Sequence, residues 1–235
     1  YYLAKKRFDK HGIKISGLEI DMPQMIKRKN EVVAQTVGGI EFLMKKNKID
    51  VHNGFGSFID KTTIAVKGEK EDRRIETDKV IIATGSKPAN LPFITLDKKR
   101  VITSTEALNL KVVPKHMIVI GGGVIGVELG SVYARLGAKV SVVEFLDNLI
   151  PTMDKTMGKE LQKVLKKSGF EFYLKHKVTA VEAKGANVKV TAENSSGETV
   201  ELNGDYCLVS IGRSPYTEGL ALENAGVVAT DRGQI

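Results

Sequence analysis

The hydrophobic pattern divides the chain into three stretches. In the first, apolar residues recur at helical spacing and predict a long helix, with Asp21 as its N-cap and Pro23 in its first turn. The adjacent glycines Gly38 and Gly39 interrupt the pattern and indicate either a small-residue contact or a kink. We expect the helical stretch to end at about Lys48. The apolar positions that carry this prediction are Met22, Met25, Ile26, Val32, Val33, Val37, Ile40 and Leu43.

The middle stretch changes to the two-residue period of β-strands. Residues 51–59 and 62–66 are predicted to form short strands, the first broken by glycines. A further strand is expected over residues 75–83, ending in the continuous apolar run Val-Ile-Ile-Ala. Such a run is typical of a strand that is buried on both faces of a sheet. A loop rich in proline and polar residues should follow, from Gly85 to about Pro114.

In the last stretch, strands and helices alternate from His116 onward, which predicts an α/β domain with a parallel sheet. Glycines at 185, 197 and 204 mark turns and indicate that the later strands form a meander. The expected helices cover residues 124–136, ended by Gly137, and the segment from the cap Asp154 to Ser168. The expected strands cover residues 117–120, 139–144, 170–174, 178–183, 188–192 and 199–211.

The strongest chemical signal is the sequence Gly121-Gly122-Gly123-Val124-Ile125-Gly126, which lies between a predicted strand and a predicted helix. A lone GxGxxG is common, but this context is the one that a dinucleotide-binding βαβ unit requires. Gly121 would permit the tight turn, Gly123 would let a pyrophosphate approach the backbone, and Gly126 would let the helix pack against the strand. The phosphates would then meet the free N–H groups at the start of the helix.

Glu144 lies at the end of the next predicted strand, 23 positions after Gly121. An acidic residue at this place accepts hydrogen bonds from the adenosine ribose, and its charge would repel a 2′-phosphate. The pattern therefore favours NAD over NADP. The alternative is a purely structural strand–turn–helix with an incidental glutamate.

A second segment, Ala83-Thr84-Gly85-Ser86, takes a buried strand into a sharp turn. By its residue types alone it is better interpreted as a structural strand end than as a binding site. The segment lies about thirty-five residues before the glycine motif, and at this distance it resembles the segment of two-dinucleotide flavoproteins that returns from the flavin domain. This resemblance favours a cofactor contact over a purely structural role.

The likeness to that family, the pyridine nucleotide-disulfide oxidoreductases, extends over essentially the whole chain. Within the family the chain resembles the dihydrolipoamide dehydrogenases. The segments that carry the resemblance are His11-Gly12-Ile13, Gly54-Phe55-Gly56, Gly123 to Ser131, Val143-Glu144-Phe145 and Ile211-Gly212-Arg213-Ser214-Pro215.

The resemblance implies a role for each matching residue. Gly56, Thr84, Gly85 and Ser86 would contact FAD. Glu144 would hold the adenosine ribose of NAD. The remaining NAD contacts would come from Gly121, Gly122, Gly123, Val124, Ile125, Gly126, Val127, Glu128, Val178 and Gly212. Without the resemblance, Val178 is equally well an ordinary strand residue and Glu128 a solvated carboxylate.

The resemblance also implies a fold and an activity. It predicts a two-dinucleotide-binding flavoprotein of α/β class: part of an FAD-binding domain over residues 1–112 and a nearly complete NAD-binding domain over 113–235. The parent would oxidise dihydrolipoamide with NAD through FAD and a redox disulfide. The implied partners are lipoamide or a lipoyl-bearing protein, a second copy of the chain, and a 2-oxoacid dehydrogenase complex.

If the resemblance holds, we do not expect this chain to catalyse the reaction of the family by itself. The redox cysteine pair and the catalytic base of the family have no counterpart in the sequence, so we expect no disulfide turnover. The first glycine-rich FAD motif of the family is also missing, so we expect no retained FAD. The first residues lack an initiator Met and an apolar leader, and we expect the chain to be an internal piece of a longer polypeptide. Two alternatives stay open: another disulfide reductase, of the mercuric or glutathione type, or a noncatalytic NAD(H)-binding module.

The composition limits the classes of binding partner and the cellular compartments that we expect for the protein. The net charge is +8, and the lysines are spread along the chain in pairs without interleaved aromatic residues, which favours solvated helix faces over a nucleic-acid site. No apolar run approaches the length that crosses a membrane. The single cysteine, Cys207, is expected in the core and fits a reducing compartment, and the family resemblance implies bacterial cytoplasm or mitochondrial matrix. The four histidines, which have no partners at motif spacing, are expected in turns or at the surface, and no metal site is predicted.

Overall fold

The computed structural model describes residues 1–69 and 71–235 and divides the chain into two compact units. Unit 1 consists of Tyr1–Lys29 and Pro88–Gly212, and unit 2 of Asn30–Lys87 and Arg213–Ile235. The predicted division into cofactor domains at residue 112 concerns which cofactor each part holds, and it stays a prediction.

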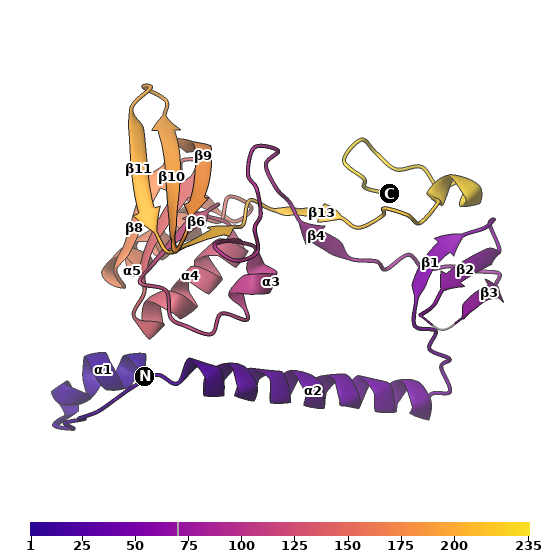
Figure 1. Ribbon diagram of the computed structural model, residues 1–235, viewed down its shortest axis with the longest axis horizontal. Coiled ribbons are helices and arrows are strands. Elements are labelled where there is room, and N and C mark those ends of the chain that lie inside the picture. The colour runs from indigo at the N-terminus through magenta and orange to yellow at the C-terminus, as the bar shows by residue number, and fades with distance from the viewer. Residues whose placement is uncertain (70) are drawn as a thin grey trace. The chain divides into compact units, whose positions relative to one another are not determined.

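Unit 1 is built on a five-stranded parallel sheet in the order β5-β12-β6-β7-β8 (Figure 1). This sheet confirms the α/β class that the alternation of strands and helices predicts. Its strands are β5 (Val101–Ile102), β6 (His116–Ile120), β7 (Lys139–Glu144), β8 (Phe170–Leu174) and β12 (Tyr206–Val209).

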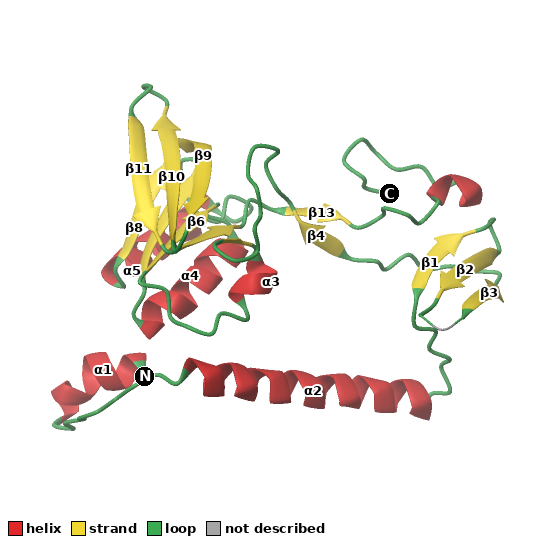
Figure 2. Ribbon diagram, in the orientation of Figure 1, coloured by secondary structure: helices red, strands yellow, loops and turns green. Residues whose placement is uncertain are grey.

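The two faces of this sheet are covered by different layers. Successive side chains of a strand point to opposite faces, so Met117 and Val119 join one buried cluster while Ile118 and Ile120 join another. The helices cover the first face, where Val127 and Leu165 pack. The antiparallel meander covers the second face (Figure 2). Burial on both faces explains why the central parts of these strands are mostly apolar.

The covering elements begin and end where the sequence predicts. Helix α4 (Val124–Leu136) ends at Gly137, which adopts a left-handed conformation, and α5 (Lys155–Lys167) begins at Asp154, whose carboxylate accepts the Thr156 N–H. The meander consists of β9 (His176–Lys184), β10 (Asn187–Asn194) and β11 (Thr199–Gly204). The predicted strand region 199–211 is divided at Asp205, so that β11 lies in the meander and β12 in the parallel sheet.

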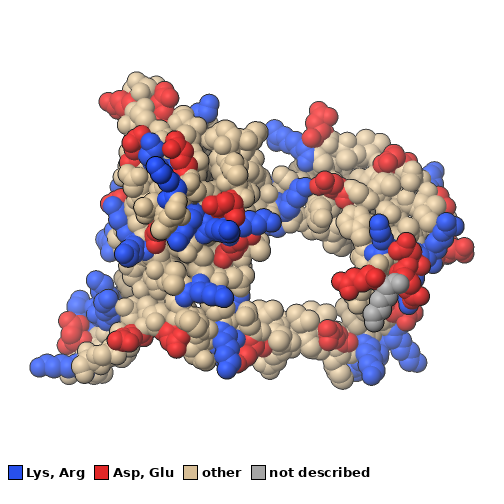
Figure 3. Space-filling view, in the orientation of Figure 1, with Lys and Arg blue, Asp and Glu red and all other residues tan. Residues whose placement is uncertain are grey.

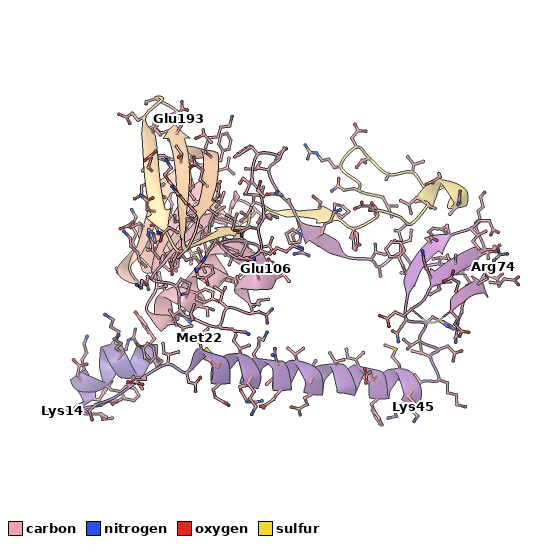
Figure 4. The ribbon with its side chains drawn as sticks, in the orientation of Figure 1. Lys14, Met22, Lys45, Arg74, Glu106 and Glu193 are labelled. Carbon is pink, nitrogen blue, oxygen red and sulfur yellow. The ribbon has the colours of Figure 1, made fainter. Side chains whose placement is uncertain are left out.

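The predicted loop 85–114 contains short elements that the pattern does not indicate. Besides β5, it holds β4 (Ser86–Pro88) and α3 (Ser104–Ala107). Thr103 and Glu106, the latter labelled in Figure 4, form a reciprocal capping box at the start of α3. Elements of two to four residues are too short to produce a periodic signal, which is why the prediction of a loop was wrong here.

The predicted long helix is present as α2 (Met22–Lys46), and it runs without interruption through both glycines. A Cβ built on either Gly38 or Gly39 would have no atom within 4 Å, so the chain has no close contact at this point. Before it lie α1 (Tyr2–Arg7) and the 3-10 helix η1 (Phe8–His11). Met22, labelled in Figure 4, is buried at the start of α2 in the core of unit 1.

Unit 2 has a smaller core. Strands β1 (Phe55–Phe58), β2 (Thr63–Lys67) and β3 (Asp72–Glu76) form an antiparallel sheet. Phe58 packs with Leu220 and with Leu222 of the 3-10 helix η2 (Leu222–Ala225). A further two-stranded sheet joins β4 to β13 (Arg213–Pro215).

The prediction of a doubly buried strand at residues 80–83 is wrong. Among the described residues this segment pairs with no strand, and Ile81 is 90% exposed. Only Ile82 packs on the small apolar cluster of unit 2. An apolar run becomes a buried strand only where neighbouring strands exist to accept its backbone hydrogen bonds, and here none lies beside it in the part of the chain that the structure describes.

The composition also predicts dispersed surface charge, a buried cysteine and no membrane-spanning segment. Lysine, arginine and acidic side chains lie interspersed on the visible face, without one dominant basic patch (Figure 3). Cys207 is fully buried, as predicted, and burial raises the pKa of its thiol. Within residues 1–69 and 71–235 no helix is long and apolar enough to span a membrane, and no cluster of metal-ligating side chains is found.

Candidate functional site

The glycine motif and Glu144 meet at one edge of the parallel sheet of unit 1. Gly121 follows β6 directly, Glu144 is the last residue of β7, and Ser210 follows β12. Because the three strands are parallel, their carboxyl ends lie at the same edge, which is the place where open α/β sheets bind ligands.

Two glycines of the motif are required by the fold itself. Gly121 has φ +102°, and a Cβ there would lie 2.5 Å from the carbonyl oxygen of Ser210. A Cβ on Gly126 would lie 2.3 Å from the carbonyl oxygen of Gly121 and 2.9 Å from Val119. The predicted tight turn and the predicted close packing of helix on strand are therefore both present.

Gly123 differs from these two because nothing in the chain explains it. A Cβ there would meet no atom within 4 Å, and its φ of −73° is open to any residue. It is the N-cap of α4, whose first N–H groups have no acceptor within the helix. Open space beside Gly123, at the start of this helix, is what an anionic group would need.

The Glu144 side chain is turned back onto the glycine turn. It is 8% exposed, and its carboxylate accepts hydrogen bonds from the N–H of Gly122 at 2.6 Å and of Leu146 at 2.7 Å. Each carboxylate oxygen keeps a further lone pair, so the group can accept hydroxyl protons as well. The sequence places Glu144 at this edge, but it does not indicate the contact with Gly122.

The other predicted NAD residues lie in the same unit. Glu128 is exposed on α4, beside a depression lined by Leu108, Val132 and others. Val178 is buried on β9, in the apolar cluster that also contains Ile120. Gly212 is exposed two residues beyond Ser210, with φ +137°.

The predicted FAD residues lie in unit 2. Gly56 and Thr84 line a pocket of about 330 Å³, together with aromatic and aliphatic side chains that include Phe55, Ile82 and Tyr216. A Cβ on Gly56 would lie 3.9 Å from Ile64, which is ordinary contact, so the fold does not require a glycine there.

Gly85 and Ser86 take part in a different contact. Gly85 has φ +74°, and its carbonyl accepts the N–H of Tyr216 at 3.0 Å. The guanidinium of Arg213 donates to the Ser86 hydroxyl at 2.6 Å and also to the Ser86 carbonyl. Two segments that the sequence analysis singles out, 83–86 and 211–215, are thus neighbours through the pairing of β4 with β13.

The interpretation of His116 as a turn or surface residue is wrong. It begins β6 and is partly buried, its Nδ1 lies 2.7 Å from the Asn203 carbonyl, and its Nε2 lies 2.8 Å from the hydroxyl of Ser141. Ser141 donates in turn to Glu171, which is paired with Lys139. This cluster lies at the amino ends of the strands, away from the glycine turn. Its members come from β6, β7, β8 and β11, and the register of the parallel sheet together with the packing of the meander brings them together.

Two residues near the glycine turn have no sequence signal as site residues. Ser210 donates its hydroxyl to the carbonyl of Ile120, and its own backbone approaches Gly121. The position after a buried parallel strand is the one clue that could have indicated it. Ile150 donates its N–H to the carbonyl of Gly122 at 2.8 Å, and nothing in its residue type predicts this.

Comparisons with known proteins agree on one family. The sequence profile of the family described as pyridine nucleotide-disulphide oxidoreductase matches residues 3–235. Dihydrolipoyl dehydrogenase from mitochondria of Pisum sativum is 43% identical over 100% of the chain, and dihydrolipoyl dehydrogenase 3 of Pseudomonas putida is 45% identical over 93%. The crystal structure of LpdA from Mycobacterium tuberculosis superposes with a TM-score of 0.87 at 29% identity, covering 99% of the chain.

The match covers only part of those proteins. The chain spans 47% of the Pisum sativum protein, 48% of the Pseudomonas putida protein and 50% of the LpdA chain. It therefore spans about half the length of the relatives and of the solved structure that it matches.

Proposed function

The chain belongs to the pyridine nucleotide-disulphide oxidoreductase family, and from this premise we propose that it forms part of a flavoenzyme that oxidises dihydrolipoamide with NAD. Unit 1 would bind NAD, and unit 2 would contribute to FAD binding. The observation that carries the proposal is the carboxyl edge of the parallel sheet, where Gly121, Gly126 and Glu144 meet in the arrangement of a dinucleotide site.

In the NAD site, Gly123 and the first turn of α4 would receive the pyrophosphate. The space in front of Gly123 and the free N–H groups of the helix fit an anion, and the helix dipole adds to the attraction. The remaining residues of the turn and the helix, Gly121, Gly122, Val124, Ile125, Gly126, Val127 and Glu128, would line the nucleotide.

Glu144 would accept hydrogen bonds from the hydroxyls of the adenosine ribose. Its carboxylate would also repel the 2′-phosphate of NADP, and no lysine or arginine stands among residues 145–150 to neutralise that phosphate. Val178 and Gly212 would complete the NAD surface, although the burial of Val178 in the core supports a packing role equally well.

In unit 2, Gly56 and Thr84 would approach FAD through the pocket that both line. A Cβ on Gly56 would make only an ordinary contact with Ile64, so packing within the chain does not explain this glycine, and a close approach of FAD would account for it. Gly85 and Ser86 would follow on the same segment, with Ser86 oriented by Arg213. FAD, when bound, supplies the redox chemistry between a dithiol and NAD, while the protein binds and orients the cofactors.

The disulfide chemistry of the parent would lie in the half of the relatives that this chain does not span. Cys207 is the one cysteine of the chain, and its burial and raised pKa make it an inert thiol. Lipoamide or a lipoyl-bearing protein, a 2-oxoacid dehydrogenase complex and a second copy of the parent are the proposed partners. The cytoplasm of a bacterium or the mitochondrial matrix is the proposed compartment.

Nucleotide titration of this chain by calorimetry tests the NAD site. The chain should bind NAD more tightly than NADP, and Glu144→Ala should weaken NAD binding about tenfold or more through the lost hydrogen bonds. Glu144→Gln keeps an acceptor for the N–H of Gly122 but removes the charge, so it should mainly reduce the discrimination against NADP. Glu182→Ala, an exposed glutamate of β9, is the matched control. Unchanged NAD affinity in Glu144→Ala would remove the ribose assignment.

A second experiment tests the parent activity. The full-length protein should be yellow from bound flavin, and it should reduce NAD when dihydrolipoamide is added. A colourless full-length protein that binds NAD would instead support a noncatalytic nucleotide-binding module.

A further inference from the structure

Ile150 has a backbone conformation that its residue type rarely adopts. Its φ is +43°, in the left-handed region, where a β-branched side chain is an outlier. It also precedes Pro151, and a following proline disfavours helical backbone angles and favours extended ones at the residue before it. The other left-handed non-glycine residues of unit 1, Lys98 and Lys175, are exposed lysines, whereas Ile150 is only 8% exposed.

The unusual conformation directs the Ile150 N–H at the glycine turn. This N–H donates to the carbonyl of Gly122 at 2.8 Å, while the N–H of Gly122 donates to Glu144 at 2.6 Å. The N–H of Gly122 is therefore bound to the end of β7, and its carbonyl is bound to the segment between β7 and α5. The carbonyl of Ile150 accepts the N–H of Met153 at 2.9 Å, so Ile150 is also hydrogen-bonded to the turn that leads into α5.

Close packing holds this segment in place on two sides. A Cβ on Gly122 would lie 2.7 Å from the Leu149 side chain, and a Cβ on Gly158 of α5 would lie 2.5 Å from the Leu149 carbonyl. Leu149 is fully buried between these two glycines. The surroundings thus determine the conformation of Ile150, which is the condition under which an unfavourable backbone geometry persists.

We propose that Ile150 is a positioning residue for the nucleotide. Its N–H holds the carbonyl of Gly122, and so orients the next residue, Gly123, toward the open space before any ligand arrives. A turn that is already ordered loses less conformational freedom when it binds a ligand. This inference rests on the proposed NAD site and adds to it a residue that makes no contact with the nucleotide.

The test compares two proline substitutions. Ile150→Pro removes the N–H and imposes a negative φ, and it should weaken NAD binding at least about tenfold. Lys98→Pro is the matched control, because Lys98 is also left-handed (φ +58°) and also donates its N–H within a turn, to Val101 at 3.1 Å. Lys98→Pro should lower the melting temperature and leave NAD affinity within about twofold of the unmodified chain. Equal NAD affinity of folded Ile150→Pro and the unmodified chain would overturn the proposal.

Ile150→Gly separates the backbone from the side chain. Glycine keeps the N–H and accepts a positive φ, so this variant should retain about ten times more NAD affinity than Ile150→Pro, even though loss of the buried side chain lowers its melting temperature. An affinity as low as that of Ile150→Pro in a folded Ile150→Gly protein would contradict a role for the N–H.

A measurement without nucleotide keeps the inference distinct from the NAD assignment. In the unmodified chain, the amide of Ile150 should be protected from hydrogen exchange to a similar extent as the amides of β6. Exchange of this amide at the rate of an open loop would contradict the hydrogen bond from Ile150 to Gly122 and so overturn the proposal. This result does not depend on whether Ile150→Pro folds. Failure of the unmodified chain to bind NAD would instead overturn the proposed function and leave the protection unchanged.

Discussion

Unit 1 carries a parallel sheet with an apolar layer on each face, whereas the core described in unit 2 is the small cluster around Phe58, Leu220 and Leu222. The central strands β6, β7 and β12 of unit 1 are almost entirely buried, and Ile118 is fully buried. In unit 2, equally apolar segments are exposed: Ile81 to 90%, and Val37 and Ile40 of α2 to about half.

The difference shows that apolar sequence alone does not produce a core. Both units contain runs of β-branched residues, but only in unit 1 does the chain supply the neighbouring strands and the covering helices. The cofactor assignments follow the same division. The proposed NAD site has its turn, helix and acidic residue together in unit 1, whereas the proposed FAD residues of unit 2 line a pocket of about 330 Å³.

The largest expected effect compares one isoleucine from each unit. Ile118→Ala should reduce the free energy of unfolding of unit 1 by about 2–5 kcal/mol, since it removes a fully buried side chain between two layers. Ile81→Ala should change the free energy of unfolding by no more than about 0.5 kcal/mol, because that side chain is 90% exposed. Chemical denaturation of both variants measures the contrast. Similar losses in the two variants would mean that the exposed run of unit 2 is covered in solution.

An intermediate effect compares two glycines inside helices. Gly126→Ala should weaken NAD binding about tenfold or more, because the added methyl would collide with the Gly121 carbonyl and with Val119 and would push α4 away from the turn and from β6. Gly38→Ala on α2 meets no atom within 4 Å and should stabilise the helix by about 0.5–1 kcal/mol without affecting NAD. Calorimetry and thermal unfolding check the two outcomes. Normal NAD affinity in Gly126→Ala would mean that the helix can move away from the strand without loss of the site.

The smallest expected effect is a pH dependence of unit 1. Burial lowers the pKa of His116 below its ordinary value; the Asn203 carbonyl opposes this, Lys139 adds to it, and Glu171 and Asp205 oppose it. The unfolded chain then binds the proton more readily than the folded chain, so stability is complete above about pH 6.5 and decreases as the pH falls below it.

Denaturation at pH 7.5 and pH 5.5 measures this dependence. His116→Asn, which does not titrate, should show a flatter change between the two pH values than the unmodified chain. A pKa of His116 at or above 6.5 by NMR titration would contradict the expected direction.

The sequence predicts the longer helices and strands of unit 1 closely but misses the short β5 and α3, and in unit 2 it predicts β1 and β2 but not the end of the third strand. Residues 124–136 and 139–144 have the predicted bounds, because caps, glycine stops and apolar periodicity all agree there. Residues 80–83 do not form the predicted strand, because pairing depends on a neighbour that the pattern of one segment cannot reveal. Likewise, the partners of His116 come from strands that are remote in sequence, so spacing could not indicate them.

The sequence by itself determined the order of strands and helices in unit 1 and the residues of the glycine turn, because these depend on local periodicity and on backbone conformations that only glycine adopts readily. Tertiary structure decided which apolar runs are buried, that Glu144 binds the N–H of Gly122, and that a left-handed Ile150 holds its carbonyl. These features join segments that the chain separates by 22 residues or more, and only the packing of β7 and α5 against the turn brings them into contact.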